Sequence, residues 1–342
     1  MVTVFPPLRN SAKSKSFCMP IISVVMSVYN DAQRVKTSVD SILNQTFTDF
    51  EFIIINDGST DETGTILDRL ASQDSRIKVI HQENTGLTQA LIRGCNQAQG
   101  EFIARQDADD YSYPQRLELQ LAKIQSSPQI GMVSCSTQYI GPEGEPLTII
   151  QRSETPEIAT QELLHRRQGP GAHGSVLFRK SVYNAVGGYR PDFYFAQDSD
   201  LWLRIAEKAQ FASLSQILYL HRREINSTSG VNRAIQLRFG ELGQLCKTAR
   251  LNSQSESVYL EEAKQLRSQL LANKWQKHPP DPLAVAQATY FLGSQLLTNG
   301  DRRAVNYLWQ TVGLCPWHWK GWFRLGQSIL QFPFAKVHTI PY

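Results

Sequence analysis

Hydrophobic residues in the first third of the chain alternate between continuous apolar runs and segments with helical spacing. The run "PIISVVMSVYN", from Pro20 to Asn30, is rich in β-branched residues and is typical of a strand buried on both faces. The segment after it places apolar residues at i, i+4, i+7 and i+8, as one face of a helix does: Val35, Val39, Ile42 and Leu43. This stretch therefore predicts a strand followed by a helix.

The same alternation recurs twice before residue 110. "FEFIIINDGSTD" predicts a second buried strand that breaks into a turn and leads to a helix, and a short strand at 78–80, another helix and a strand at 102–105 follow. Successive strand–helix units predict an α/β fold with a mostly parallel central sheet and helices on both faces. Ligands bind at the carboxyl ends of strands in such sheets, where "SVYN", "NDGSTD" and "QDADD" are expected.

From about residue 234 the pattern becomes helical throughout. The pair Leu292-Gly293 recurs as Leu325-Gly326, 33 positions later, at positions like those of tetratricopeptide helix pairs. A plain helical cap on the preceding domain explains the same pattern, because two copies are fewer than a repeat array normally needs. We therefore expect three parts, namely a flexible tail over 1–19, an α/β domain over 20–233 and a helical region over 234–342.

Composition narrows the classes of partner. The 342-residue chain has 35 basic and 31 acidic residues, and the resulting net charge of +4 is too small to indicate nucleic acid. Five cysteines without a CxxC pair favour reduced thiols and a cytoplasmic location. The apolar run after Pro20 is far shorter than the roughly 20 residues that span a bilayer, while the basic N-terminal tail permits peripheral association with the inner face of a membrane.

The stretch "EFIARQDADD" ends an apolar run with three aspartates, Asp107, Asp109 and Asp110. Residues i and i+2 of an extended segment point the same way, so Asp107 and Asp109 are expected to face one ligand while Asp110 faces away. Paired carboxylates at a strand end suit a hard divalent cation that completes its shell with phosphate oxygens. Capping of the next helix is the alternative, and it accounts for one aspartate better than for three.

The stretch "NDGST" also has two interpretations. Gly58 can adopt a positive φ, and Asp57 lies where the strand becomes a loop. Asp57 is then either the acceptor of a turn hydrogen bond or a carboxylate that accepts hydrogen bonds from a nucleobase or ribose. The residues alone leave both interpretations open.

Four stretches together resemble one known family. They are, in chain order, "ISVVMSVYND", "FEFIIINDGSTDET", "NTGLTQALIRGCNQAQGEFIARQDADD" and "AQDSDLWLRIAE". In this order they resemble the inverting family 2 glycosyltransferases over about 20–230. The resemblance implies a glycosyltransferase-A fold, a nucleotide-sugar donor, and Mg²⁺ or Mn²⁺ bound through a DxD motif.

The resemblance also implies roles for individual residues. It places a group of four residues in the nucleotide pocket: Ser27, Val28, Tyr29 and Asn30. It places Asp57 at the nucleobase, commonly uracil in the family, and Asp107 near the ribose or donor sugar. It makes Asp109 a metal ligand and Asp198 the catalytic base.

One departure from the family lies before the expected helix "SDLWLRIAEKA". Gln197 stands where the family often has glutamate, and because a glutamine cannot serve as a base, that role falls on Asp198, with Asp200 as the second candidate. Trp202, four positions after Asp198, either stacks on an acceptor sugar or packs in the core. Because Gln197 replaces the glutamate that the family often has, contacts with the acceptor beside Asp198 are expected to differ from those of the family.

Three further residues have a functional and a structural interpretation. His173 precedes the strand "SVLF" and either contacts phosphate or acceptor or is structural. His221 precedes a polar loop and is a candidate further metal ligand. Arg105 either neutralises phosphate or pairs with nearby acidic residues.

These observations predict a metal-assisted transfer of a sugar, with inversion, from a UDP-linked donor to a hydroxyl of a glycan or lipid-linked acceptor, as in polysaccharide or cell-envelope synthesis. A sugar nucleotidyltransferase is less well supported, because the segment after the first strand, "SVYNDAQRV", lacks a glycine-rich phosphate loop. The remaining alternative is a catalytically idle nucleotide-binding scaffold whose helical C-terminal region binds a protein partner.

Overall fold

A computed structural model gives the structure of residues 19–224, 233–272 and 282–332. Its strands are β1 Ile22–Val28, β2 Phe50–Asp57, β3 Ile77–Gln82, β4 Phe102–Asp107, β5 Tyr111–Ser112, β6 Ile130–Ile140, β7 Pro146–Ile150, β8 Leu177–Arg179 and β9 Gln210–Arg222. Its helices are α1 Val35–Leu43, α2 Thr63–Gln73, α3 Leu87–Gln97, α4 Arg116–Gln125, α5 Pro156–Arg166, α6 Lys180–Ala185, α7 Gln197–Ala206, α9 Arg233–Leu251, α10 Ser257–Ala272, α11 Pro282–Thr298, α12 Ala304–Leu314 and α13 Trp319–Gln331, with a 3-10 turn at His173–Ser175. Apart from Met19, the predicted tail lies outside the described residues.

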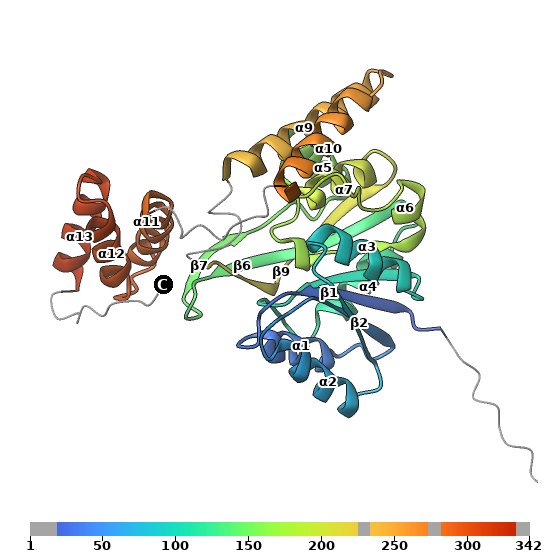
Figure 1. The fold of residues 1–342 in the computed structure, drawn as a ribbon, viewed down its shortest axis with the longest axis horizontal. Helices are drawn as coiled ribbons and strands as arrows, with labels where there is room; N and C mark the ends of the chain where they lie inside the picture. Colours follow the sequence, from blue (N-terminus) through green and yellow to red (C-terminus); the bar gives the residue numbers. More distant parts are fainter. Residues whose placement is uncertain (1–18, 225–232, 273–281, 333–342) are drawn as a thin grey trace, which may run out of the picture.

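The first half of the sheet is parallel, with strand order β3-β2-β1-β4. Side chains along β1 and β2 alternate between two cores: Val24 and Ile54 pack with α1 and α2, whereas Val25 and Ile53 pack with α3. All four of these side chains are fully buried. Burial on both faces is the reason that these strands are continuous apolar runs, and it confirms the predicted α/β arrangement (Figure 1).

The second half of the sheet is mixed. Strand β8 pairs antiparallel with both β4 and β6, β6 pairs parallel with β9, and β5 pairs antiparallel with the end of β9. Strand β7 folds back antiparallel on β6. The long β6 and β9 strands therefore carry the chain from the sheet centre to the β6–β7 hairpin (Figure 1).

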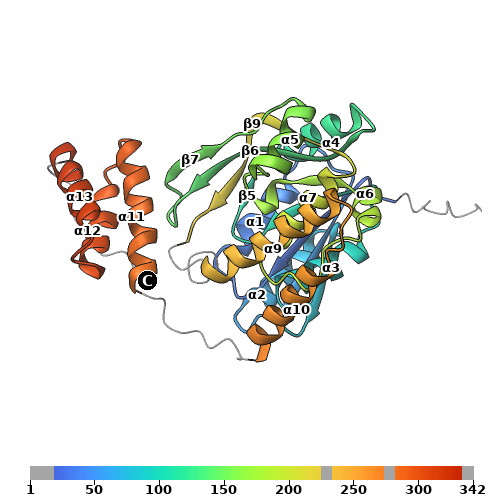
Figure 2. The ribbon, with the colours of Figure 1, turned by 90° about the horizontal axis from the view of Figure 1, so that it is seen from above.

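The helical C-terminal region is confirmed, and its described helices form two separate packing units. Helices α9 and α10 cover the loop before α7, with Phe239 of α9 packed on Phe193 and Phe195. Helices α11–α13 form their own cluster, which Leu147 of β7 joins, at the β6–β7 end of the sheet (Figures 1 and 2). Gly293 in α11 faces Leu308 of α12 so closely that a Cβ would lie 2.6 Å from its side chain.

The described part of the C-terminal region contains two pairs of consecutive helices, α9–α10 and α11–α12, and then α13. The tetratricopeptide interpretation stays a prediction. The described cysteines Cys95, Cys135, Cys246 and Cys315 are buried and free, and Cys18 lies outside the described residues. None of the described helices is long and apolar enough to cross a bilayer.

Candidate active site

The carboxyl ends of β1, β2 and β4 meet at one edge of the sheet. In the parallel register Ser27 lies beside both Ile55 and Asp107, and Val28 lies beside Asn56. The three polar stretches that were predicted to share an edge therefore do so. Ser27 and Val28 at the end of β1, Asp57 at the end of β2 and Asp107 at the end of β4 therefore lie at the same edge.

Asp57 is the anchor of the loop before α3. Its carboxylate is 2% exposed and accepts hydrogen bonds from the backbone N–H groups of Thr85 and Gly86, each at 2.9 Å. The adjacent Gly58 has φ +77°, and a Cβ there would lie 2.6 Å from the backbone nitrogen of Asn84. The turn hydrogen bond within "NDGST" is accepted by Asn56, whose Oδ1 receives the N–H of Ser59 at 3.2 Å, whereas the Asp57 carboxylate is held at the sheet edge by the loop before α3.

The loops after β1 and β2 are tied together through Asn30. This residue has φ 51°, a left-handed conformation that asparagine tolerates better than most residues. Its side-chain oxygen accepts from the backbone N–H of Thr60 at 2.7 Å, and its own N–H donates to Ser59 Oγ at 3.0 Å. The neighbouring Tyr29 ring is 46% exposed, so an aromatic face is available beside these loops.

The three clustered aspartates have different environments. Asp107 Oδ1 accepts from Arg105 at 2.8 Å, and Asp110 is 2% exposed and pairs with His221 Nδ1 at 3.0 Å. Among the described residues no hydrogen bond reaches the Asp109 carboxylate. Burial, together with the charges of Asp110 and Asp107, raises the pKa of Asp109 to about 8.

Such an uncompensated carboxylate fits a divalent cation. The donor set offered here is oxygen, which Mg²⁺ and Mn²⁺ prefer. Within the described ranges no group of three His, Cys, Asp or Glu side chains is arranged to hold a metal alone. A cation at Asp109 would therefore complete its shell with water and with oxygens of a bound ligand.

His221 does not fit the predicted metal-ligand role. Its Nδ1 is occupied by Asp110, and although burial opposes it, the Asp110 carboxylate raises the pKa of His221 above its usual value. In this arrangement Nδ1 is therefore engaged by a carboxylate and is not free to ligate a metal. His221 instead balances the Asp110 charge beside the open Asp109 carboxylate.

The hydrogen bonds of Arg105 all go to neighbouring protein groups in the core of the sheet. The guanidinium is fully buried and donates to Asp107 Oδ1, to the backbone oxygen of Val25 and to that of Gln106. Pairing with a nearby acidic residue, one of its two predicted roles, is the one observed. Direct contact with a phosphate is excluded by this burial, and the effect of Arg105 on a ligand passes through Asp107.

His173 lies between Arg105 and α7. Its Nε2 is 2.6 Å from Tyr189 Oη and 3.5 Å from Arg105 Nε. Burial and the Arg105 charge lower the pKa of His173 to about 3, against a smaller opposite effect of Asp198. The imidazole is therefore neutral at physiological pH and does not add positive charge for a phosphate.

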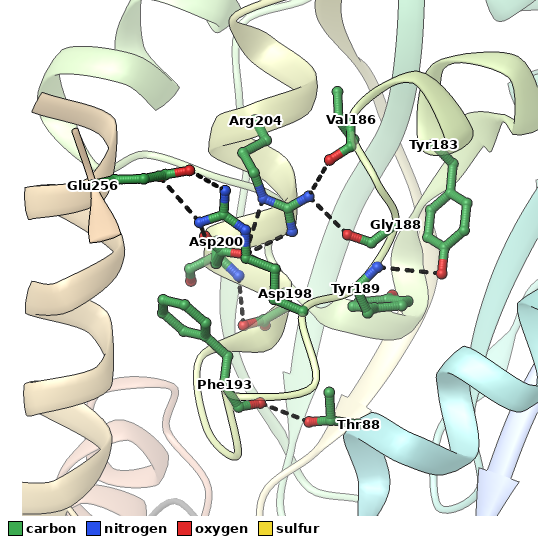
Figure 3. Close-up of polar contacts among 12 residues, drawn as sticks. Thr88, Tyr183, Val186, Gly188, Tyr189, Phe193, Asp198, Asp200, Arg204 and Glu256 are labelled. Carbon is green, nitrogen blue, oxygen red and sulfur yellow. Dashed lines mark hydrogen bonds and ion pairs between the residues drawn. The ribbon is translucent and has the colours of Figure 1, made fainter. Parts of the chain in front are cut away.

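Asp198 and Asp200 are separated by one residue yet have opposite surroundings (Figure 3). Asp198 is partly exposed at the start of α7, and its Oδ1 accepts from the N–H of Ser199 at 2.7 Å. Asp200 is 1% exposed, and its Oδ2 accepts two hydrogen bonds from Arg204, at 2.6 and 3.0 Å. The predicted substrate contact and reserve base role of Asp200 is wrong, because its carboxylate is enclosed and paired.

Trp202 belongs to the core. It is 5% exposed, its ring packs 6.1 Å from the His173 ring, and a Cβ at Gly169 would lie 3.0 Å from it. Stacking on an acceptor sugar is thus excluded, and the packing interpretation is confirmed.

An ion-pair network that sequence reasoning missed holds α7 in place. Arg190 bridges Asp200, at 3.4 Å, and Glu256 at the start of α10, at 2.5 Å. Arg250 of α9 joins Glu256 to Glu207 after the C-terminal end of α7. The spacing of Asp200 and Arg204 could have indicated an i,i+4 pair, but the contacts with Glu256 join distant parts of the chain.

Comparison with known proteins identifies the class. The family model for glycosyl transferase family 2 matches residues 23–187. The chain is 33% identical over 214 residues to the O-antigen biosynthesis glycosyltransferase WbnJ of Escherichia coli, covering 61% of this chain and 82% of that one. It is 32% identical over 210 residues to the putative glycosyltransferase EpsE of Bacillus subtilis, covering 60% and 74%. The chain belongs to glycosyltransferase family 2.

Other relatives are much longer. Chondroitin synthase of Pasteurella multocida is 29% identical over 201 residues, and the match spans 59% of this chain but only 20% of that protein.

Solved structures show the same fold. TarS 1-349 from S. aureus, in complex with UDP, has a TM-score of 0.54 at 16% identity and covers 91% of this chain and 88% of its own. The mannosyltransferase PcManGT from Pyrobaculum calidifontis, in complex with GDP-Man and Mn²⁺, has a TM-score of 0.52 at 18% identity, with coverages of 94% and 89%. The described strands and helices therefore form a glycosyltransferase-A type fold.

Proposed function

We propose that this protein transfers a sugar from a nucleotide-sugar donor to a hydroxyl group of a glycan or lipid-linked acceptor. Family membership supports the reaction type. The single observation that carries the proposal is the open Asp109 carboxylate, whose pKa is raised to about 8 by burial and two neighbouring aspartates. Burial and the two neighbouring aspartates favour the protonated form of Asp109 in the absence of a cation, and a divalent cation that displaces this proton would relieve the repulsion and, through its remaining positions, bind a diphosphate.

The donor site in this proposal is the edge formed by β1, β2 and β4. Tyr29 offers an exposed ring beside the loops that Asn30 holds, and Asp57, whose buried carboxylate anchors the loop before α3, would reach the base only by exchanging one of these hydrogen bonds for a bond to it. We propose a UDP-linked donor, because TarS has been solved with UDP and with UDP-GlcNAc. Nucleotide sugars are cytoplasmic metabolites, so the cytoplasm is the proposed location.

Asp109 would hold Mg²⁺ or Mn²⁺ together with the donor diphosphate. Such a cation offsets the charge that develops on a departing diphosphate. Asp107 is held by Arg105 at 2.8 Å, which fixes its carboxylate for contact with the ribose or donor sugar. Arg105 therefore acts through Asp107 as a positioning residue.

Asp198 is the proposed base. It is partly exposed, only its Oδ1 accepts a hydrogen bond within the described residues, and it lies in the first turn of α7. The helix dipole there favours an ionised carboxylate, which can take the proton of an attacking hydroxyl. A single base, with no second carboxylate as nucleophile, corresponds to direct displacement and inversion.

The proposal is tested by separating binding from transfer. Asp109→Ala should remove the Mn²⁺-dependent part of UDP affinity in calorimetry, whereas Asp40→Ala, on the exposed face of α1, should keep it. Asp198→Asn should keep UDP affinity and lower single-turnover transfer by at least about 10²-fold. Equal UDP affinity of Asp109→Ala with and without Mn²⁺ would refute the metal assignment. Nucleotide binding without donor cleavage or transfer in the wild type would instead support an idle scaffold.

A further inference from the structure

The α11–α13 unit exposes large aromatic side chains that a soluble surface rarely carries. Trp317 is 82% exposed, Trp319 71%, Trp322 49% and Phe323 62%. On α13 the exposed residues 319, 322, 323 and 330 recur at helical spacing, while Leu325 and Ser328 on the opposite side are buried. The helix therefore packs one stripe against its own unit and leaves an apolar stripe without a partner among the described residues.

Charge around this stripe has one sign. From residue 317 to residue 331 the chain contains two basic residues, Lys320 and Arg324, and no acidic residue, while Arg303 earlier in the unit is paired with Asp301 at 2.6 Å. Lys320 Nζ lies 5.6 Å from the centroid of the Trp319 ring. We call the set Trp317, Trp319, Lys320, Trp322, Phe323 and Arg324 the aromatic–basic face.

Aromatic residues and arginine are also enriched at protein interfaces, and it is Lys320 together with the absence of acidic residues from 317 to 331 that favours a lipid surface here. Tryptophan rings, with an apolar body and a polar N–H, reside at the depth of lipid headgroups, and Lys and Arg beside them are attracted to anionic lipids. The centre of a protein interface is depleted in lysine. Since none of the described helices can cross a bilayer, the contact would be peripheral.

We propose that the aromatic–basic face docks on the surface of a bilayer that contains anionic phospholipids. The occupant is identified by charge complementarity, because a face with only basic charges is matched by phosphate headgroups. Docking of this kind does not depend on the proposed transferase activity.

The attachment of the unit to the sheet gives docking a consequence for the active site. Tyr307 of α12 donates to Glu145 at 2.8 Å, and Asn299 donates to the backbone oxygen of Pro146 at 2.9 Å, so the unit holds the β6–β7 hairpin. Arg222 in turn donates from its side chain to Pro142 in this hairpin, at 2.7 Å, and from its N–H to Asp110, at 2.8 Å.

The chain of contacts therefore runs from the aromatic–basic face to the acidic cluster. A docked unit would tether the β6–β7 hairpin and, through Arg222, the end of β9 beside Asp110 to the membrane. If the proposed function holds, this position gives access to a lipid-linked acceptor.

Vesicle co-sedimentation of the full chain tests the proposal without donor or acceptor. We expect binding to vesicles of phosphatidylcholine mixed with phosphatidylglycerol, weaker binding to phosphatidylcholine alone, and loss of binding at high salt. The triple variant Trp319→Ala, Trp322→Ala, Phe323→Ala should lose most of the binding while keeping the wild-type circular dichroism spectrum. Lys320→Glu with Arg324→Glu should lose it selectively for anionic vesicles. The control Lys264→Glu, on the exposed surface of α10, should bind as the wild type does.

Wild-type binding by the triple variant would overturn the proposal. So would an absence of vesicle binding together with concentration-dependent dimerisation that the triple variant abolishes, because the face would then be covered by a second copy of the chain. Asp198→Asn should bind vesicles normally, so failure of docking and failure of the transferase proposal are distinguishable.

Discussion

Replacement of Asp200 by asparagine is expected to destabilise the protein, whereas the same replacement at Asp198 is not. Both side chains lie in the first turn of α7, and the substitutions are isosteric. The Asp200 side chain has 0% exposure and pairs with Arg204, whose side chain is 4% exposed. The Asp198 carboxylate accepts one local hydrogen bond, from the N–H of Ser199, which an asparagine oxygen can accept as well.

The magnitude follows from what Arg204 loses. Removal of one partner from a buried ion pair costs about 3–5 kcal/mol. Arg204 keeps its hydrogen bonds to the backbone oxygens of Val186 and Gly188, at 2.8 and 2.7 Å, and Arg190 keeps Glu256, so the lower end of this range applies. At roughly 2–4 °C per kcal/mol for a cooperative unit the size of the α/β domain, Asp200→Asn should lower the melting temperature by roughly 6–12 °C. Asp198→Asn should change stability by no more than about 0.5 kcal/mol.

Circular dichroism melts and urea titrations of both variants measure these values, with UDP affinity as a check on the donor site. The double variant Asp200→Leu, Arg204→Met should be less destabilised than the two single changes added together, because it removes both charges of one pair. An unchanged melting temperature for Asp200→Asn would refute the buried pair and return Asp200 to the candidates for substrate contact. Strong destabilisation by Asp198→Asn would show that Asp198 is structural.

Three further predictions address other parts of the chain. A chain ending at residue 233, the predicted boundary, should be less soluble than one ending at 272, because Phe193 and Phe195 lose Phe239; equal solubility would contradict this packing. Gly58→Ala should destabilise by about 1–3 kcal/mol and weaken UDP binding, since φ is +77° and Asn84 is too close; unchanged melting and calorimetry would contradict it. The pKa of His173 falls from 6.5 to about 3 on folding, so at pH values between these two the unfolded chain binds a proton that the folded chain does not, and stability drops as the pH falls from about 6.5 towards 3. His173→Gln should flatten that part of a profile of melting temperature against pH, and an unaltered slope would exclude His173 as its source.

The fold was predictable where the hydrophobic pattern of a short stretch by itself indicates which residues are buried. The run from Pro20 to Asn30 indicated a strand buried on both faces, and β1 occupies Ile22–Val28 with its side chains in two cores. The helix expected from the spacing of Val35, Val39, Ile42 and Leu43 is α1 at Val35–Leu43. The pairing of β6 with β9 was not predictable, because its partners lie about 80 residues apart and neither strand contains a signal for the other.

The site was predictable in residue type but not in role. Three aspartates of one stretch are chemically alike in the sequence, and their partners decide between them. The partner of Asp110, His221, lies 111 positions away, and this pairing leaves Asp109 as the open carboxylate. The same holds for Asp200, whose contact with Arg190 closes it against substrate. Tertiary partners, rather than motif membership, therefore separate ligands from structural anchors here.

The position of the proposed base depends on residues beyond the family-matched segment, which ends at residue 187. Helix α7 starts after that point. Arg190, which contacts Asp200 in its first turn, pairs with Glu256 just before α10. Glu207, after its C-terminal end, pairs with Arg250 of α9, and Arg250 also pairs with Glu256. Displacement of α10 would leave Arg190 with Asp200 alone and free the N-terminal turn that carries Asp198. Helices α9 and α10 are thus part of the machinery that orients the base, while α11–α13 contact the opposite margin of the site through the β6–β7 hairpin. Changes in α9 and α10 would therefore act on the orientation of the proposed base, whereas changes in α11–α13 would act on the proposed membrane contact and, through Arg222, on the acidic cluster.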